Sequence, residues 1–326
     1  FPAMNLFLHQ LDLCAPLFLL VFVGWGLRKA RFFTDEVGTA LTGFTFRFLI
    51  PVLLFDMLSD LSKMPPVDWR VLLAFFGSCM VLFTVGKIVY PKLFKVNAAG
   101  CTILAMGGVF GNNVQLGIPI LQLGLGPESM PTASLIIIFN VLILWTVAIA
   151  SVEFGGVKPD AMRGRTVGEK FAAAVPAFVR VIKNPVVAGI LAVTAFGLTG
   201  LELPTFARDT LKLVSSATTP ICLVVVGMGL ARYSFFGAIG KNLCVTVTKL
   251  VFQPALVFLL CLALGLPTLE TQVATLMSTL PVAINVYIMS ADFKAEEGAA
   301  SSSILLSTLL SALTVPLVLA FFGITG

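Results

Sequence analysis

Long apolar stretches alternate with short polar segments along the whole chain. A helix needs about 20 apolar residues to cross the hydrocarbon core of a bilayer, and the 326 residues offer ten stretches of this kind. The segments between them are rich in charged residues, proline and glycine. We therefore predict an all-α integral membrane protein with ten transmembrane helices, at 10–27, 37–59, 68–90, 98–125, 131–152, 184–200, 205–231, 241–265, 268–291 and 298–323.

The composition supports this class and excludes others. Hydrophobic residues make up 58% of the chain, charged residues 11%, and the mean hydropathy is +1.02. Soluble domains carry about 25% charged residues, so this chain has too few charges to coat a surface that faces water. A soluble enzyme, a disordered protein and a nucleic-acid binder are excluded. The six cysteines lie in apolar stretches without a CxxC pair, so we expect no metal site, no disulfide framework and no cofactor.

The basic residues predict how the spans are oriented. With the N-terminus outside, the inside loops hold fifteen lysines and arginines and the outside loops hold four. An excess of this kind marks the cytoplasmic side, so both termini are predicted outside. The long segment 153–183 carries six of the inside cations and has apolar residues at helical spacing. We interpret it as a cytoplasmic loop with a helix at the inner headgroup layer.

Helix-breaking residues recur at an offset of 169, which indicates an internal duplication. The matching pairs are Pro16 and Pro185, Pro51 and Pro220, and Asn112 and Pro281. Two repeats of five spans must be inverted relative to each other, because five is odd. Inverted repeats are typical of secondary transporters, whose sites lie where paired helices are broken. The predicted domains are the first repeat at 4–152, the loop at 153–183 and the second repeat at 184–326.

The fourth and ninth spans contain the strongest helix breakers. The fourth has glycines before Asn112 and Asn113, and Gly-x-Pro after them; the ninth has Pro281, followed by Asn285. Amide side chains are costly in hydrocarbon unless they are hydrogen-bonded, and irregular backbone is tolerated only where it lines a cavity or is buried in protein. We expect the fourth span to unwind between Gly111 and Pro119, and the two breaks to cross.

Crossed breaks bring two half-helix N-termini to one point, where free N–H groups and helix dipoles favour an anion. Amide side chains add uncharged donors, so the pattern predicts a site for a carboxylate. The alternative, that the asparagines only join helices by hydrogen bonds, stays open. The predicted substrate-binding residues are Gly111, Asn112, Asn113, Gln115, Pro281, Ile284 and Asn285, with Pro51 and Val52 shaping the rest of the pocket.

Three charged residues within spans can be interpreted either as functional or as side chains that extend to the membrane surface. Arg47 attracts an anionic substrate or reaches the inner headgroups. Lys249 lies about eight residues into its span, which favours a side chain that extends to the headgroups. Asp56 is a candidate for proton coupling but lies near a span end. The chain has a single histidine, His9, which leaves no HExxH zinc site and no Ser-His relay, so we do not expect an enzyme.

Several motifs together resemble the auxin efflux carrier family. The longest is the run from Gly111 to Pro119, which is similar to the crossover in the family's fourth helix. Further similarities cover most of the chain, in the same order and spacing. They are Leu49–Phe55, Thr219–Pro220 with Val226–Ala231, Lys249–Leu250 with Pro254, Leu280–Pro281 with Asn285, and Ser307–Ser311 with Pro316.

The resemblance implies an elevator-like transporter with an inverted 5+5 repeat, related to sodium/proton antiporters and bile-acid symporters. Helices 1, 2, 6 and 7 would form a scaffold that often dimerises, and helices 3–5 and 8–10 a mobile transport core. Asn112 would contact the substrate carboxylate, Pro281 would be the ninth-helix crossover proline, and Asn140 would lie near the site. Gly111 stands where the plant exporters have proline, and the central loop is shorter, so a bacterial inner-membrane carrier fits better.

The expected function is export or exchange of small organic anions, such as malonate-like or malate-like carboxylates or auxin-like acids. A sodium-coupled bile-acid-type symporter is the near alternative. A membrane sensor without transport, or an intramembrane enzyme, is the alternative of another class. We expect a small organic anion and the lipid bilayer as partners, a homodimer, and no nucleic acid. The anion and its coupling ion stay open.

Overall fold

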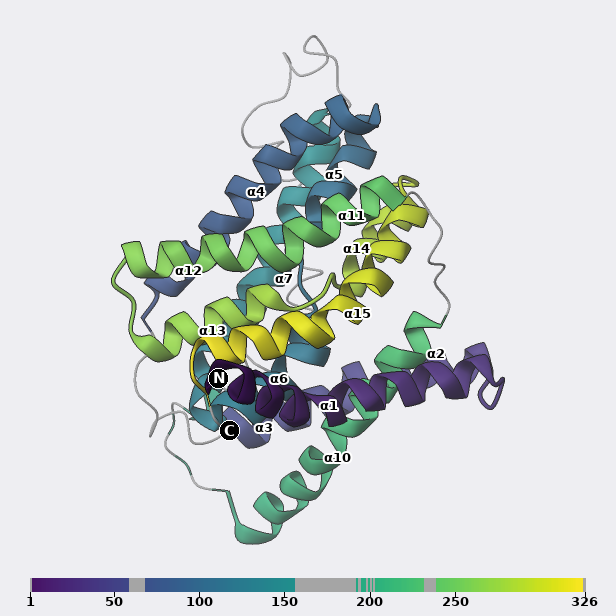
Figure 1. Ribbon diagram of the computed structural model, residues 1–326. Helices are drawn as coiled ribbons and strands as arrows, with labels where there is room; N and C mark the ends of the chain where they lie inside the picture. Colours follow the sequence, from purple (N-terminus) through teal and green to yellow (C-terminus); the bar gives the residue numbers. More distant parts are fainter. Residues whose placement is uncertain are drawn as a thin grey trace.

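The computed structural model describes residues 2–58, 68–155, 192, 195–197, 199, 201, 203–231 and 239–324. Within these ranges every regular element is a helix, and the β-type contact is a single antiparallel bridge between Gly111 and Val282. Figure 1 shows long helices that run side by side, with shorter helices between them. The predicted all-helical class is confirmed.

The helices follow the order of the predicted spans. From the N-terminus to the central loop they are α1 (Pro2–Lys29), α2 (Asp35–Phe44), η1 (Thr45–Leu49), α3 (Ile50–Leu58), α4 (Arg70–Phe94), α5 (Ala98–Gly107), η3 (Asn113–Gly117), α6 (Ile118–Leu125), η4 (Pro127–Ser129) and α7 (Met130–Gly155). After that loop they are α10 (Thr205–Leu230), α11 (Ile239–Val247), η6 (Thr248–Phe252), α12 (Gln253–Ala263), α13 (Thr268–Thr279), α14 (Ile284–Asp292) and α15 (Glu297–Phe321).

Within the described residues, seven stretches of uninterrupted helix are long and apolar enough to cross a membrane. They are Leu8–Lys29, Glu36–Leu53, Arg70–Phe94, Pro127–Val152, Thr205–Leu230, Ile239–Ala263 and Glu297–Phe321. The predicted spans 98–125 and 268–291 are not among these seven, because each is broken into two shorter helical parts. The predicted span 184–200 and the predicted interfacial helix within 153–183 lie mostly outside the described residues. The chain is a multi-pass membrane protein.

In the part of the chain that the structure describes, three spans each contain one stretch of π-helix. These stretches are η1, η3 and η6, and they hold Arg47, Asn113 and Lys249 respectively. A π-helical turn is rare and is frequently found at functional sites, because it re-aims the side chains that follow it. The sequence pattern did not predict these turns.

Helix α10 packs against both α1 and α3, and α4, α5, α7 and α11 to α15 pack mainly among themselves, while α15 also packs against α1. Figure 1 shows α1, α3 and α10 along the lower edge of the molecule, with α4, α5, α7 and α11 to α15 above them. The contact between α1 and α10 is very close at two glycines. A Cβ atom on Gly227 would lie 1.8 Å from the carbonyl oxygen of Val21, and one on Gly24 would lie 2.0 Å from that of Val224. Such approach between membrane helices requires small residues.

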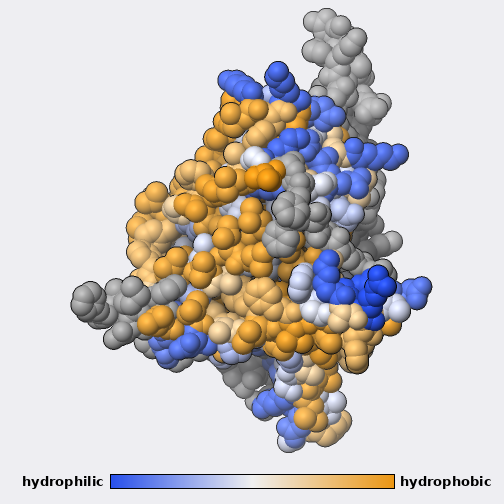
Figure 2. Space-filling model, turned by 45° about the vertical axis from the view of Figure 1, so that its right-hand side comes forward, coloured by the Kyte–Doolittle hydropathy of each residue, from blue (hydrophilic) through white to orange (hydrophobic). Residues whose placement is uncertain are grey.

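The surface separates into a broad apolar part and hydrophilic patches. Figure 2 shows hydrophobic residues over most of the visible face, with hydrophilic residues toward its upper and right-hand margins and in smaller groups along its lower edge. Arg28 and Lys29 lie in the last turn of α1, and at another helix end the Lys241 ammonium pairs with the Glu296 carboxylate at 2.7 Å. At the opposite end of α1, the Gln10 amide donates to the carbonyl of Ile324. The beginning of α1 and the end of α15 therefore lie side by side.

Candidate functional site

Two helix breaks lie at the centre of the site. Helix α5 ends at Gly107, and the chain is non-helical until η3 begins at Asn113. Helix α13 ends at Thr279, and an extended segment leads to α14, which begins at Ile284. The prediction that the fourth span unwinds between Gly111 and Pro119 is wrong in its position. The break comes earlier, at the glycines before Asn112. Pro119 lies within the helix that runs on from η3 into α6, next to the π-helical turn, and local π adjustments of this kind let membrane helices tolerate proline.

The two breaks are joined by main-chain hydrogen bonds. The Asn112 N–H donates to the Pro281 carbonyl at 2.8 Å, and the Ala283 N–H donates to the Phe110 carbonyl at 2.9 Å. The N–H of Val282, between them, donates to the Ser307 hydroxyl of α15 at 3.0 Å. Main-chain groups in hydrocarbon must find partners within the protein, and this exchange supplies them where each helix is interrupted.

A cavity of about 40 Å³ lies beside this crossing. It has room for about two or three water molecules, which is comparable with the oxygens of one carboxylate. Its walls come from both breaks, from the first residues of η3 and α14, and from α7. The lining residues are Phe110, Gly111, Asn112, Asn113, Val114, Gln115, Ile137, Asn140, Ala283, Ile284 and Asn285.

Seven of the predicted substrate-binding residues meet at this cavity. They are Gly111, Asn112, Asn113, Gln115, Asn140, Ile284 and Asn285. Pro281 lies behind them and accepts the hydrogen bond from Asn112. Both half-helices that start here present their N-terminal residues to the same space, which places the positive ends of two helix dipoles beside it. Part of the first turn of η3 is already hydrogen-bonded, since the Asn113 N–H donates to the Gly111 carbonyl at 2.9 Å.

The amide side chains of the cavity differ in how many of their polar atoms have hydrogen-bond partners. The Asn112 Oδ1 accepts the Gln115 N–H at 3.3 Å, and the Asn112 Nδ2 donates to the Gln115 side chain at 3.4 Å. The side chain of Asn113 is only 3% exposed, yet neither its oxygen nor its nitrogen has a hydrogen-bond partner among the described residues. The same holds for the oxygen of Asn140. A buried amide without a partner is costly, so these groups are available to a ligand.

Lys249 lies directly behind the cavity wall, which the sequence analysis did not predict. Its side chain is 0% exposed, so the expectation that it reaches the headgroups is wrong. The ammonium donates to the Ser278 carbonyl at 2.5 Å, in the last turn of α13. It also lies 3.1 Å from the point where a Cβ of Gly111 would be, and the Asn113 oxygen is 2.8 Å from that same point. Helix C-termini favour cations, which explains this position.

Gln253, one turn after Lys249, contacts the other of the two helix breaks. Its side-chain nitrogen donates to the Val109 carbonyl at 3.0 Å, just beyond the end of α5. The span that contains η6 therefore caps the C-terminal ends of both broken helices. The polar character of Lys249 and Gln253, four residues apart in an apolar span, is the sequence signal that points to this role.

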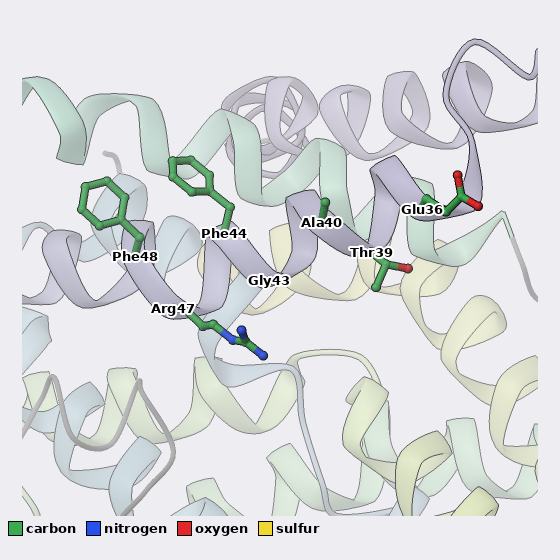
Figure 3. Close-up of a pocket in the computed structure, with 7 residues that line it drawn as sticks. All are labelled: Glu36, Thr39, Ala40, Gly43, Phe44, Arg47 and Phe48. Atoms are coloured by element: carbon green, nitrogen blue, oxygen red, sulfur yellow. The ribbon is translucent and has the colours of Figure 1, made fainter.

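The remaining predicted residues lie elsewhere. Pro51 and Val52 are on α3 and do not line the cavity. Arg47 is exposed and borders an open groove of about 840 Å³ along α2 and η1. Figure 3 shows its side chain extending away from the helix on the side opposite Phe44 and Phe48. Asp56 is also on α3, outside the cavity lining.

Comparison with known proteins covers nearly the whole chain. The profile of the family described as "Membrane transport protein" matches residues 11–319. A "Putative malonate transporter" of Rhizobium meliloti (strain 1021) is 26% identical over 310 residues, 93% of this chain and 92% of that protein. An "Uncharacterized transporter" of Methanocaldococcus jannaschii is 22% identical over 316 residues, 94% of this chain and 97% of that protein. "Auxin efflux carrier component 8" of Arabidopsis thaliana is 22% identical over 358 residues, 96% of both chains.

These relatives match 93–96% of the chain, and their names are those of transporters, not enzymes. The broken helices and the cavity at their crossing lie within the matched residues. The chain therefore belongs to the membrane transport protein family, the family of the auxin efflux carriers, and is a membrane transporter.

Proposed function

We propose that the protein is a secondary transporter of small organic anions and that it binds their carboxylate at the crossing of the two helix breaks. The observation that carries this proposal is the cavity at which two half-helix N-termini and unpartnered amides meet, with a buried lysine behind its wall at Gly111. Helix N-termini bind anions through free N–H groups and the helix dipole. Lys249 adds a positive charge behind Gly111, whereas the site predicted from the sequence had only uncharged donors.

The substrate class follows from the size and charge of the site. The cavity accepts one carboxylate, and Lys249 is the one cation that the described residues place next to it. Malonate-like and malate-like acids and auxin-like acids all carry such a group. One relative is named for malonate and another for auxin efflux, so both kinds of acid belong in the first screen.

The proposed architecture is ten helices in an inverted repeat, with repeats at 4–152 and 184–326 around the 153–183 loop. Two contacts support it. The Asn112 N–H meets the Pro281 carbonyl, and the Thr218 hydroxyl donates to the Leu49 carbonyl at 3.3 Å. The partners in both contacts are 169 residues apart, which is the offset of the prolines. Residues related by an inverted repeat meet in this way near the pseudo-two-fold axis.

The proposed mechanism is elevator-type alternating access in a plasma membrane, the inner membrane of a bacterium. Helices 1, 2, 6 and 7 form the scaffold, through which two copies pair, and helices 3–5 and 8–10 form the moving core. The close packing of α10 with α1 and α3 supports the scaffold, and the contacts among α4, α5, α7 and α11 to α14 support the core, which meets the scaffold where α15 packs against α1. The adjacent ends of α1 and α15 support termini on one side, which we assign to the outside.

The test is solid-supported-membrane electrophysiology on proteoliposomes, with tracer uptake for electroneutral transport. Malonate, malate, lactate and indole-3-acetate are applied in choline or sodium buffer, with and without a pH gradient. We expect sodium-independent flux of at least one acid. Flux that requires sodium contradicts the expected sodium independence and favours a bile-acid-type symporter. Binding without any flux favours a sensor.

Asn112→Ala tests the site itself. A ligand at about 100 times its Kd stabilises a protein by about 2.7 kcal/mol, and we expect this gain to vanish in the variant because a cavity donor is lost. Asn97→Ala is the matched control, since Asn97 caps α5 through the Gly100 N–H at 2.8 Å, away from the cavity. We expect Asn97→Ala to lower the free energy of unfolding by about 1 kcal/mol and to keep the stabilisation by substrate. Equal stabilisation of Asn112→Ala and wild type by the acid contradicts the proposed site.

A further inference from the structure

Lys249 is a buried charge without a carboxylate partner in the part of the chain that the structure describes. It is the eleventh of the 25 residues in the span Ile239–Ala263, close to the middle of the bilayer. Arg70 pairs with Asp68 and Lys241 pairs with Glu296, and neither pair involves Lys249. An unpaired ammonium at this depth costs several kcal/mol.

The groups that face Lys249 are uncharged. They are the Ser278 carbonyl of α13, the Asn113 amide of η3 and, from α4, the Cys79 thiol, which accepts a hydrogen bond from Gln253 at 3.3 Å. A neutral amine also donates to the Ser278 carbonyl, so this contact survives loss of the proton. The environment therefore accommodates both forms of the side chain, and the charged form lacks a counter-charge until an anion arrives.

The cavity supplies that counter-charge. Gly111 separates Lys249 from the cavity, and because glycine has no Cβ, only the main chain stands between the ammonium and a bound carboxylate. The unpartnered Asn113 amide lies beside the same point and faces both. A carboxylate in the cavity stabilises the protonated lysine, and the protonated lysine stabilises the carboxylate.

We propose that Lys249 carries the coupling proton, so that the protein moves one proton with each organic anion. Lys249 takes up a proton from water on the side where the anion binds and releases it to water on the side where the anion leaves. The empty carrier then returns with a neutral amine, and no unpaired charge crosses the bilayer. This inference rests on the proposed function and names its coupling ion.

The first test measures proton movement by the wild-type protein. Full-length protein is reconstituted with the pH dye pyranine inside, in sodium-free choline buffer, and radiolabelled malonate, malate, lactate or indole-3-acetate is applied under an inward proton gradient. We expect internal acidification by one proton for each acid anion taken up. Uptake without proton movement, or uptake that requires sodium, overturns this inference but leaves anion transport standing. No flux with any of the four acids overturns the proposed function, and this inference with it.

Two substitutions of Lys249 separate charge from proton exchange. Arginine stays protonated, so Lys249→Arg is expected to retain exchange of external for internal acid while its net uptake falls at least about tenfold, equivalent to about 1.4 kcal/mol. Lys249→Met removes the charge without leaving a buried polar group, and any residual uptake is expected to lose its proton coupling. Persistence of exchange in Lys249→Arg shows that the protein is folded.

Lys87→Met is the matched control. Lys87 is a half-buried lysine on α4 that donates to the Thr102 hydroxyl at 2.9 Å, away from the cavity. We expect its uptake and its proton stoichiometry to equal those of wild type. Proton-coupled uptake by Lys249→Met at the wild-type rate overturns the inference, as does net uptake by Lys249→Arg at that rate.

Discussion

At the scale of single residues, Gly111 has the most crowded position in the site. The space next to its Cα is shared by the Asn113 oxygen and the Lys249 ammonium, at 2.8 and 3.1 Å from an added Cβ. Both neighbours are buried, so neither moves away without displacing other groups. The absence of a side chain is therefore a structural requirement of the site.

Gly111→Ala is expected to weaken binding of the transported acid at least about tenfold and to lower the free energy of unfolding by about 1–3 kcal/mol, because overpacking displaces Asn113 and Lys249. Microcalorimetry and thermal unfolding in detergent measure the two effects. Gly43→Ala is the control, since no atom lies within 4 Å of its added Cβ. Unchanged affinity in Gly111→Ala would show that the space beside this glycine is not used for substrate.

The amide residues of the site are easier to predict from the sequence than its cation. Adjacent asparagines among glycines are conspicuous in an apolar span, because each is costly there without a partner. Lys249 is equally conspicuous as a charged residue in an apolar span, but a lysine within reach of a helix end can extend to water. Its burial depends on partners in α13 and η3. Those contacts are set by tertiary packing. Pro119 was misjudged because its effect depends on its position within a helix, not on its presence.

At the scale of elements, the crossing of α1 and α10 depends on two glycines whose side-chain positions are filled by the partner's main chain. Gly227→Ala is expected to lower the free energy of unfolding by about 3 kcal/mol, because its Cβ would lie 1.8 Å from the Val21 carbonyl oxygen and the helices must separate. Denaturant titration followed by circular dichroism measures this loss.

Gly229→Ala is the matched control on the same helix, two residues along. No atom lies within 4 Å of its added Cβ, so the substitution removes a glycine from a helix without a clash and raises stability by up to about 1 kcal/mol. Equal stability of the two variants would mean that α1 and α10 do not approach as closely as described.

The elements themselves were largely predictable, since span length and apolar content follow from the thickness of the bilayer. Helix ends such as Phe94 and Leu230 lie within a few residues of the predicted boundaries. The π-helical turns η1, η3 and η6 were not predictable, because one extra residue in a turn leaves no mark on an apolar pattern. Those turns decide where Asn113 and Lys249 point.

At the scale of the whole molecule, the orientation in the membrane gives a direct prediction. The segment that contains Lys294, between α14 and α15, is expected on the cytoplasmic side, and the start of α13 at Thr268 on the outside. Both residues are exposed. Single cysteines at these positions, Lys294→Cys and Thr268→Cys, should react with a membrane-impermeant maleimide only from inside and only from outside, respectively. The reverse pattern in intact cells would contradict the assigned orientation.

The hydrogen bonds that join the two breaks have a consequence for divergence between relatives. The Asn112 N–H, Pro281 carbonyl, Ala283 N–H and Phe110 carbonyl are all main-chain groups, so this part of the crossing does not depend on which side chains surround it. Cavity residues are then free to be exchanged over evolutionary time while the crossing persists. We therefore expect the main-chain crossing to recur in relatives that share only 22–26% of their residues with this chain and include one named for malonate and one named for auxin.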